Sequence, residues 1–288
     1  MTPTAPPRRF RREIAFVGQG GGGPTDGMLR GAAFDLLHVQ VHSDRAAAGL
    51  MAARLAAEVL RAAIARQGGA RVILACAPSQ TEMLAALVTM PVEWARVTVF
   101  HMDEYAGLAA DHPASFRRYL RDHFLAHVRP AAFHGLAGEA ADAGAECRRY
   151  AELLAAAPVD LGCLGIGENG HLAFNDPPVA DFADRFLVKP VELDETCRRQ
   201  QVNDGCFASL AAVPRQALTL TIPALLAVRR LIVTVPGERK APAVRATLHG
   251  PVTTACPASI LRTHAAATLH LDPAAAALCT FPPESAHR

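Results

Sequence analysis

The sequence predicts an α/β protein with a three-layer α/β/α, Rossmann-like fold, a mostly parallel sheet and a single domain. Short apolar segments of strand length alternate along the chain with longer, Ala-rich segments of helical character. Of the 288 residues 51% are hydrophobic, which is enough to bury such strands between two layers of helices.

The expected elements begin at residue 37. Strands are expected at 37–41, 71–75, 96–101, 159–165, 218–222, 231–235 and 268–271. Helices are expected at 44–65, after a turn at 78–80, at 113–127 and from about Lys240. Ser43 stands where it can cap the first helix. No repeat or interior linker interrupts this pattern, so residues 37–280 are expected to form one domain.

The two ends of the chain differ from this pattern. Residues 1–36 combine prolines, a basic patch and the glycines of 20–23, and a flexible N-terminal extension is expected there. The glycines are no convincing nucleotide loop, because Pro24 and Gly27 spoil the helix that should follow. Residues 281–288 are expected to be a C-terminal tail.

Composition excludes several classes of function. The net charge of +2 gives no field for nucleic acid, and no apolar run reaches the roughly 18 residues of a membrane span. Seven irregularly spaced cysteines without a C-x-x-C argue against disulfides and zinc, which favours a reducing, cytoplasmic location. His123 and His127 lack a third ligand, so neither a metal nor a cofactor is expected. Whether the chain forms a homo-oligomer stays open.

In this architecture ligands bind beyond the carboxyl ends of the strands. The strand expected at 96–101 runs directly into Asp103 and Glu104. An acidic side chain at a strand exit can be aimed inward and partly desolvated, which suits a general base. The alternative for Asp103 is a helix cap or a solvated turn.

A second strand end, after 159–165, carries a Gly-rich turn that contains His171. Asn169 and Asp176 flank this histidine, and a carboxylate beside an imidazole can fix its tautomer. The glycines let the backbone approach a ligand closely. The alternative is a structural histidine; the surrounding glycines favour a catalytic one.

The third strand end, after 71–75, offers an anion site. Free backbone N–H groups at a strand-to-helix turn can bind a phosphate, and Ser79, Gln80 and Thr81 are the candidate side chains. Ser79 and Glu82 also fit a capping box, so phosphate binding requires Glu82 to turn outward.

Two basic residues are candidates to complete the anion site. Lys240 follows the strand at 231–235 at the start of a helix, and Arg198 lies in the segment between the Gly-rich turn and that strand. The alternative for each is a solvated surface charge.

The motifs resemble those of the glucosamine-6-phosphate deaminase family. Residues 100–108, FHMDEYAGL, resemble F-x-M-D-E-Y-x-G-L, and 112–115, HPAS, resemble H-P-x-S. Residues 165–177, GIGENGHLAFNDP, resemble G-x-G-x-D-G-H-x-A-F-N-E-P. The resemblance covers about residues 37–280, and Arg198 and Lys240 fall near the family's phosphate-binding Arg and Lys.

The resemblance implies a metal-free conversion of glucosamine 6-phosphate, a small sugar phosphate, to fructose 6-phosphate and ammonia. His171 would open the sugar ring, Asp103 would move a proton from C2 to C1, and Asp176 would orient His171. The alternatives are a 6-phosphogluconolactonase, whose motif continues A-S-L-F-P after the histidine, and a non-catalytic sugar-phosphate-binding protein.

The chain departs from the family at three places. Asn169 replaces an Asp and Asp176 replaces a Glu in the His171 segment. Residues 75–82, ACAPSQTE, replace a Gly-rich phosphate loop, so the side chains of this segment are expected to crowd the anion site.

Overall fold

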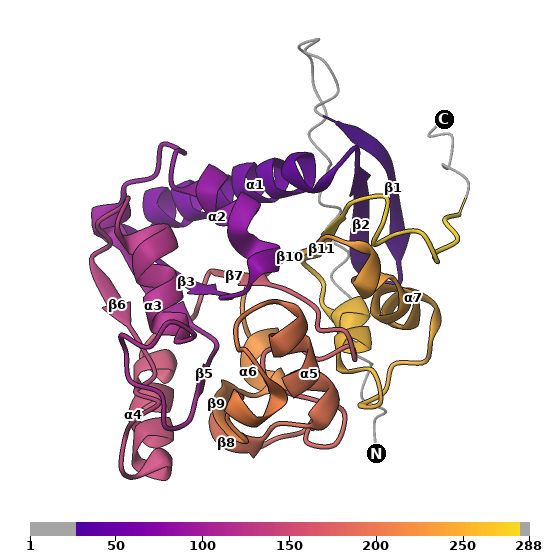
Figure 1. Cartoon of the computed structure of the whole chain (residues 1–288). Coiled ribbons are helices and arrows are strands. Elements are labelled where there is room, and N and C mark those ends of the chain that lie inside the picture. Colours follow the sequence, from indigo (N-terminus) through magenta and orange to yellow (C-terminus); the bar gives the residue numbers. More distant parts are fainter. Residues whose placement is uncertain (1–26, 283–288) are drawn as a thin grey trace, which may run out of the picture.

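The computed structural model describes residues 27–282, and its centre is an eight-stranded sheet (Figure 1). The spatial order is β1–β2–β11–β10–β7–β3–β4–β6. Seven strands run parallel, and only β1 pairs antiparallel, with β2. The predicted mostly parallel α/β fold is confirmed. The strands are β1 Met28–Phe34, β2 Leu37–His42, β3 Ala70–Leu74, β4 Val97–His101, β6 Ala132–His134, β7 Leu161–Leu164, β10 Arg230–Val235 and β11 Ala267–Leu271.

A second, antiparallel sheet consists of β5 (Asp103–Tyr105), β9 (Gln216–Leu220) and β8 (Val188–Glu192). The strand expected at 218–222 belongs to this small sheet. It ends before residue 222 because Thr221 caps a helix there, its hydroxyl accepting a hydrogen bond from the N–H of Ala224.

Helices cover both faces of the large sheet, as Figure 1 shows. Apolar side chains of α1 and α2 pack in one core with β3, β4 and β7, and α4, α6 and α7 contribute to a second core on the opposite face. This is the three-layer arrangement. The helices are α1 Arg45–Gln67, α2 Thr81–Leu87, α3 Phe116–Leu120, α4 Ala143–Ala155, α5 Glu195–Asn203, α6 Ile222–Leu226 and α7 Ala241–His249, with a π-helical turn at Arg121–Leu125 and 3-10 segments elsewhere.

The N-terminal boundary differs from the prediction. Strand β1 lies inside the segment assigned to the flexible extension, and all of its residues are exposed or half-buried at the edge of the sheet, so it lacks the apolar pattern of the central strands. Residues 1–26, with the glycines of 20–23, and residues 283–288 lie outside the described part. At α1 the cap is Asp44 rather than Ser43, because the Asp44 carboxylate accepts the N–H of Ala47 at 2.8 Å.

Four neighbouring strands, β10, β7, β3 and β4, end at the same edge of the sheet. The segments that follow them carry Lys240, His171, Ser79 and Asp103. Because parallel strands present their carboxyl ends together, the topology gathers side chains from residues 79 to 240 at one place. Among the described helices none is both long and apolar enough to cross a membrane.

Candidate active site

An open cavity lies at this edge of the sheet, with about 580 Å³ of space not filled by protein atoms. Four of the predicted site residues line the cavity: Asp103, His171, Ser79 and Lys240. Gly165 and Gly167 form part of its wall.

Asp103 is the buried acid of the cavity. Its side chain comes from the first residue of β5, is 7% exposed as a residue, and makes no hydrogen bond to the described part of the protein. Burial, and then the neighbouring charge of Glu104, raise the pKa of the Asp103 carboxyl well above its ordinary value. A carboxylate in such surroundings is a stronger base than one in water.

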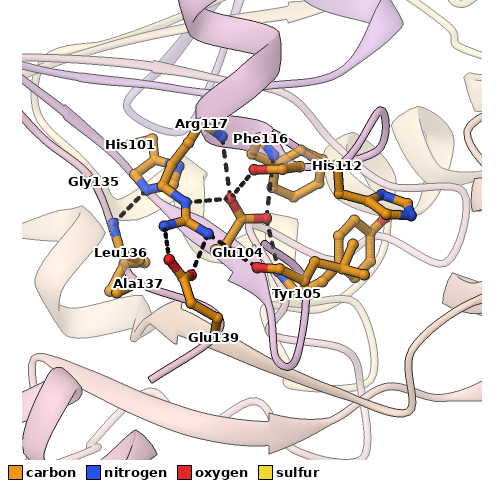
Figure 2. Close-up of polar contacts among 12 residues, drawn as sticks. His101, Glu104, Tyr105, His112, Phe116, Arg117, Gly135, Leu136, Ala137 and Glu139 are labelled. Carbon is orange, nitrogen blue, oxygen red and sulfur yellow. Dashed lines mark hydrogen bonds and ion pairs between the residues drawn. The ribbon is translucent and has the colours of Figure 1, made fainter. Parts of the chain in front are cut away.

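Side chains alternate along a strand, so Glu104, the next residue, lies on the other side of β5 from Asp103. Its contacts there are shown in Figure 2. Its carboxylate is fully buried and accepts hydrogen bonds from the Ser115 hydroxyl at 2.8 Å and the N–H groups of Phe116 and Arg117 at 3.1 Å. The guanidinium of Arg117 also donates to it from Nε at 3.2 Å. Glu104 therefore anchors the start of α3, and of the two acids only Asp103 lines the cavity.

His171 and Asp176 form a dyad on the Gly-rich turn. His171 Nδ1 lies 2.9 Å from Asp176 Oδ1. Burial acts to raise the pKa of Asp176, but the hydrogen bonds to it, that of His171 foremost, hold this pKa below its ordinary value. The ionised Asp176 can therefore fix the His171 ring so that Nε2 is left for a ligand.

Two neighbours hold this dyad in place. Asn169 donates from Nδ2 to Asp176 Oδ1 at 3.0 Å, and its own oxygen accepts the His171 N–H at 3.1 Å. A Cβ on Gly167 would lie 2.2 Å from the His171 ring, so only glycine leaves room for the imidazole. The substitution of Asp by Asn at 169 thus keeps a hydrogen-bonding role at the dyad.

Lys240 is the cation of the cavity. It is 8% exposed, yet its ammonium makes no hydrogen bond or ion pair within residues 27–282. Burial lowers the pKa of Lys240, and the charges of Asp204 and Glu168 oppose that effect. A buried ammonium without a partner lacks the compensation that folded proteins normally supply, which an anionic ligand would provide.

In the loop after β3, one side chain faces the cavity and its neighbours bind other protein groups. Ser79 lines the cavity, whereas Gln80 is fully buried and donates from Nε2 to Ser79 Oγ and to the carbonyl of Thr234. Thr81 bonds the hydroxyl of Tyr119 at 3.2 Å. Of the three side chains predicted to bind phosphate here, only Ser79 reaches the cavity.

Glu82 does turn outward, the condition set for an anion site in this loop. Its carboxylate pairs with Arg45 of α1, with Arg45 Nε 2.6 Å from Glu82 Oε1. The 3-10 turn at Pro78–Gln80 has no side-chain cap. The capping-box alternative is therefore absent from this loop.

Arg198 was expected beside Lys240, but it lies elsewhere. Its guanidinium donates to the carbonyls of Leu210 at 2.6 Å and Val213 at 3.0 Å, and it holds the turn after α5. The residues of this region that line the cavity come later in the chain: Gln200 and Gln201 near the end of α5, and Asp204 directly after it. None of these three residues was predicted, because a second cation was expected here and a neutral glutamine carries no such chemical signal in the sequence.

One group of described side chains could hold a metal. Ligand atoms of His171, Asp176 and Cys197 lie within 4.8 Å of one another. Asp176 Oδ1, however, already accepts a hydrogen bond from Asn169 and lies 2.9 Å from His171 Nδ1, so these side chains also form a His–Asp dyad without a metal.

Residues 43–270 match the model of the family described as glucosamine-6-phosphate isomerases/6-phosphogluconolactonase. The chain belongs to this family. A glucosamine-6-phosphate deaminase of Listeria monocytogenes is 37% identical over 205 residues, which is 71% of this chain and 86% of the relative. One of Lactobacillus delbrueckii is 34% identical over 212 residues, 74% of this chain and 88% of the relative.

Solved structures of this family share the fold. A monomeric glucosamine-6-phosphate deaminase superposes with a TM-score of 0.77 at 33% identity, over 84% of this chain and 99% of the other. A 6-phosphogluconolactonase from Shewanella baltica gives 0.65 at 21% identity, over 85% of this chain and 99% of the other. The second likeness concerns the fold alone.

Proposed function

We propose that this chain converts a phosphorylated amino sugar, glucosamine 6-phosphate, to fructose 6-phosphate and ammonia. The observation that carries the proposal is the meeting of a buried acid, Asp103, a His171–Asp176 dyad and an unpartnered buried Lys240 in one cavity. Relatives named as glucosamine-6-phosphate deaminases at 34–37% identity support it.

In the proposed mechanism the chain supplies two proton-transfer groups. His171, oriented by Asp176, moves a proton between the ring oxygen and the C1 hydroxyl and opens the ring. Asp103 removes the C2 proton and delivers it to C1, which converts the aldose amine through an enolamine to a ketose imine. Water then adds to C2 of the imine, and ammonia leaves. Each step conserves atoms and electrons, and no redox partner is needed.

Lys240 and Ser79 are the proposed ligands of the phosphate. The ammonium supplies a charge-assisted hydrogen bond, and the Ser79 hydroxyl and the loop around it supply neutral donors. Because Lys240 is the one cationic side chain among the described residues that line the cavity, it is expected to dominate recognition of the phosphate.

Two assays on the purified protein test this function. Ammonia and fructose 6-phosphate should form together from glucosamine 6-phosphate, while 6-phosphogluconolactone should hydrolyse no faster than without protein. Lactone hydrolysis without ammonia release would replace the deaminase proposal by the lactonase. Tight binding of the sugar phosphate without turnover would replace it by a binding protein.

A further inference from the structure

Gln201, on the last turn of α5, lines the cavity with its side-chain amide. The oxygen of this amide already has a hydrogen-bond partner in the protein. The Tyr105 hydroxyl donates a hydrogen bond of 2.6 Å to Gln201 Oε1. Gln201 is 6% exposed and Tyr105 is fully buried. The amide oxygen is therefore held inside the protein, and the amide N–H₂ is left as the group that can face a ligand.

Tyr105 is a rigid support for this contact. Its ring packs against Phe116 at 5.0 Å and against Phe174 and Phe207 at 5.2 Å between centroids. Burial raises the pKa of the Tyr105 hydroxyl well above its ordinary value, so it stays protonated and acts as a donor. The orientation of the Gln201 amide follows from that donor.

The neighbouring glutamine shows the contrast. Gln200 also lines the cavity, but both ends of its amide have protein partners: Oε1 accepts the N–H of Glu168 at 2.7 Å, and Nε2 donates to Asp204 Oδ2 at 3.4 Å. Gln201 Nε2 makes no hydrogen bond to any described residue. Of the two α5 glutamines that line the cavity, Gln201 is therefore the one whose amide N–H₂ has no protein partner in the described structure.

We propose that Gln201 binds the substrate by donating from Nε2 to an oxygen of the sugar phosphate, and that Tyr105 is the positioning residue that aims it. The inference rests on the proposed function. Asp103 and Tyr105 are two residues apart on β5 and so share one side of the strand. Strand β5 thus supplies the proposed base, Asp103, and through Tyr105 it also orients Gln201 of α5. The binding group that α5 was expected to supply was Arg198.

Three variants test the assignment: Gln201→Glu, Gln201→Met and Tyr105→Phe. Gln201→Glu keeps an acceptor for Tyr105 but removes the donors, so the KM for glucosamine 6-phosphate should rise about tenfold or more. Gln201→Met should raise it about 3- to 10-fold, and Tyr105→Phe, which frees the amide, about 3-fold. In all three kcat should change less than KM.

The control is Tyr150→Phe. Tyr150 is also fully buried and its hydroxyl donates to the carbonyls of His101 and His134, outside the cavity, so its loss should lower stability without changing KM. Thermal melting of each variant separates loss of fold from loss of binding. A KM that is unchanged in Gln201→Glu and Gln201→Met, or that follows melting temperature across all four variants, would overturn the assignment.

Inhibition by inorganic phosphate identifies the oxygen concerned. A Ki for phosphate that rises with KM in Gln201→Met places the donor on the phosphate group, and an unchanged Ki places it on a sugar hydroxyl; both support the assignment. If the wild type releases no ammonia, the proposed function fails on its own. The dissociation constant of glucosamine 6-phosphate, measured by calorimetry on the same variants, then takes the place of KM.

Discussion

Asp103 is the proposed base, and its pKa depends on burial and on the charge of Glu104. Both effects raise the pKa of Asp103, so a higher pH is needed to ionise the carboxyl before it can accept a proton. We predict that kcat rises with pH on the acid side, with a midpoint clearly above 3.8, the ordinary value for Asp. The measurement is kcat at saturating substrate, because the substrate phosphate itself titrates near pH 6 and would affect KM. A midpoint at or below 3.8 would contradict the role of Asp103.

Lys240 and Arg198 are predicted to behave differently when replaced. Lys240→Met removes a charge-assisted hydrogen bond, so the KM for glucosamine 6-phosphate should rise about 10- to 100-fold, with little effect on unphosphorylated glucosamine. Arg198→Ala should leave KM nearly unchanged and lower stability, because its guanidinium binds only protein carbonyls in the described structure. Exposed Arg245 on α7, replaced by Ala, is the control for a simple loss of positive charge.

Equal increases in KM for glucosamine and its 6-phosphate in Lys240→Met would remove the phosphate assignment. A large change of KM in Arg198→Ala would show that this arginine leaves its carbonyl partners to bind substrate. The KM values for glucosamine and for glucosamine 6-phosphate should be measured at one ionic strength, since salt screens the attraction between lysine and phosphate.

At the scale of elements, β5 and α3 are joined through the buried Glu104 (Figure 2). Removal of one partner from a buried ion pair costs about 3–5 kcal/mol. We predict that Glu104→Gln lowers the free energy of unfolding by about 3 kcal/mol, because Arg117 and two backbone N–H groups lose a charged acceptor. Urea unfolding monitored by circular dichroism measures it.

Glu139→Gln is the matched control. Glu139 pairs with the same arginine, at 2.5 Å from Arg117 NH2, but its side chain is 47% exposed. An exposed ion pair contributes about 1 kcal/mol or less, so this change should be small. Equal losses of stability in Glu104→Gln and Glu139→Gln would show that burial does not decide the strength of the network.

The same elements show what a sequence can predict. The central strands β2, β3, β4, β7, β10 and β11 were predicted, because buried parallel strands are continuous apolar runs. Strands β5 and β8 were not, since they are three and five residues long and contain charged residues whose burial depends on distant partners. Asp103 could be predicted as a site residue from its position after β4. The sequence could not predict that Asp103 lines the cavity while Glu104 binds the start of α3.

The site could be predicted as far as single residues carry a chemical signal. Asp103, His171, Ser79 and Lys240 line the cavity as strand-end reasoning suggested. Gln80, Thr81 and Arg198 do not, because a short loop or one helical turn turns neighbouring side chains to opposite sides. Gln201 was missed because its importance comes from Tyr105, which is 96 residues away in sequence.

At the scale of the whole molecule, buried histidines tie stability to pH. His270 stacks on His42, with 3.1 Å between His42 Nε2 and His270 Nδ1. Burial, and then the charges of His42 and Arg230, lower the pKa of His270 to about 3, and burial also lowers the pKa of His42. Both rings are therefore neutral in the folded protein at pH values where the unfolded chain binds protons.

Because the unfolded state binds more protons below pH 6.5, the free energy of unfolding should fall as the pH is lowered from 6.5 towards 3. We predict that His270→Gln makes this dependence shallower, by about 1.4 kcal/mol per pH unit at most. Urea unfolding at several pH values gives the slope. Exposed His38 on β2, replaced by Gln, is the control, and equal slopes in wild type and His270→Gln would refute the prediction.

In the proposed mechanism Asp103 moves the proton that converts the amino sugar to a ketose. Asp103→Asn keeps the shape of this side chain and removes its basicity, so ammonia release from glucosamine 6-phosphate should fall by about 100-fold or more, with melting temperature and KM little changed. The measurement is the initial rate of ammonia formation by the folded variant and by the wild type. Equal rates in the two proteins would contradict the mechanism.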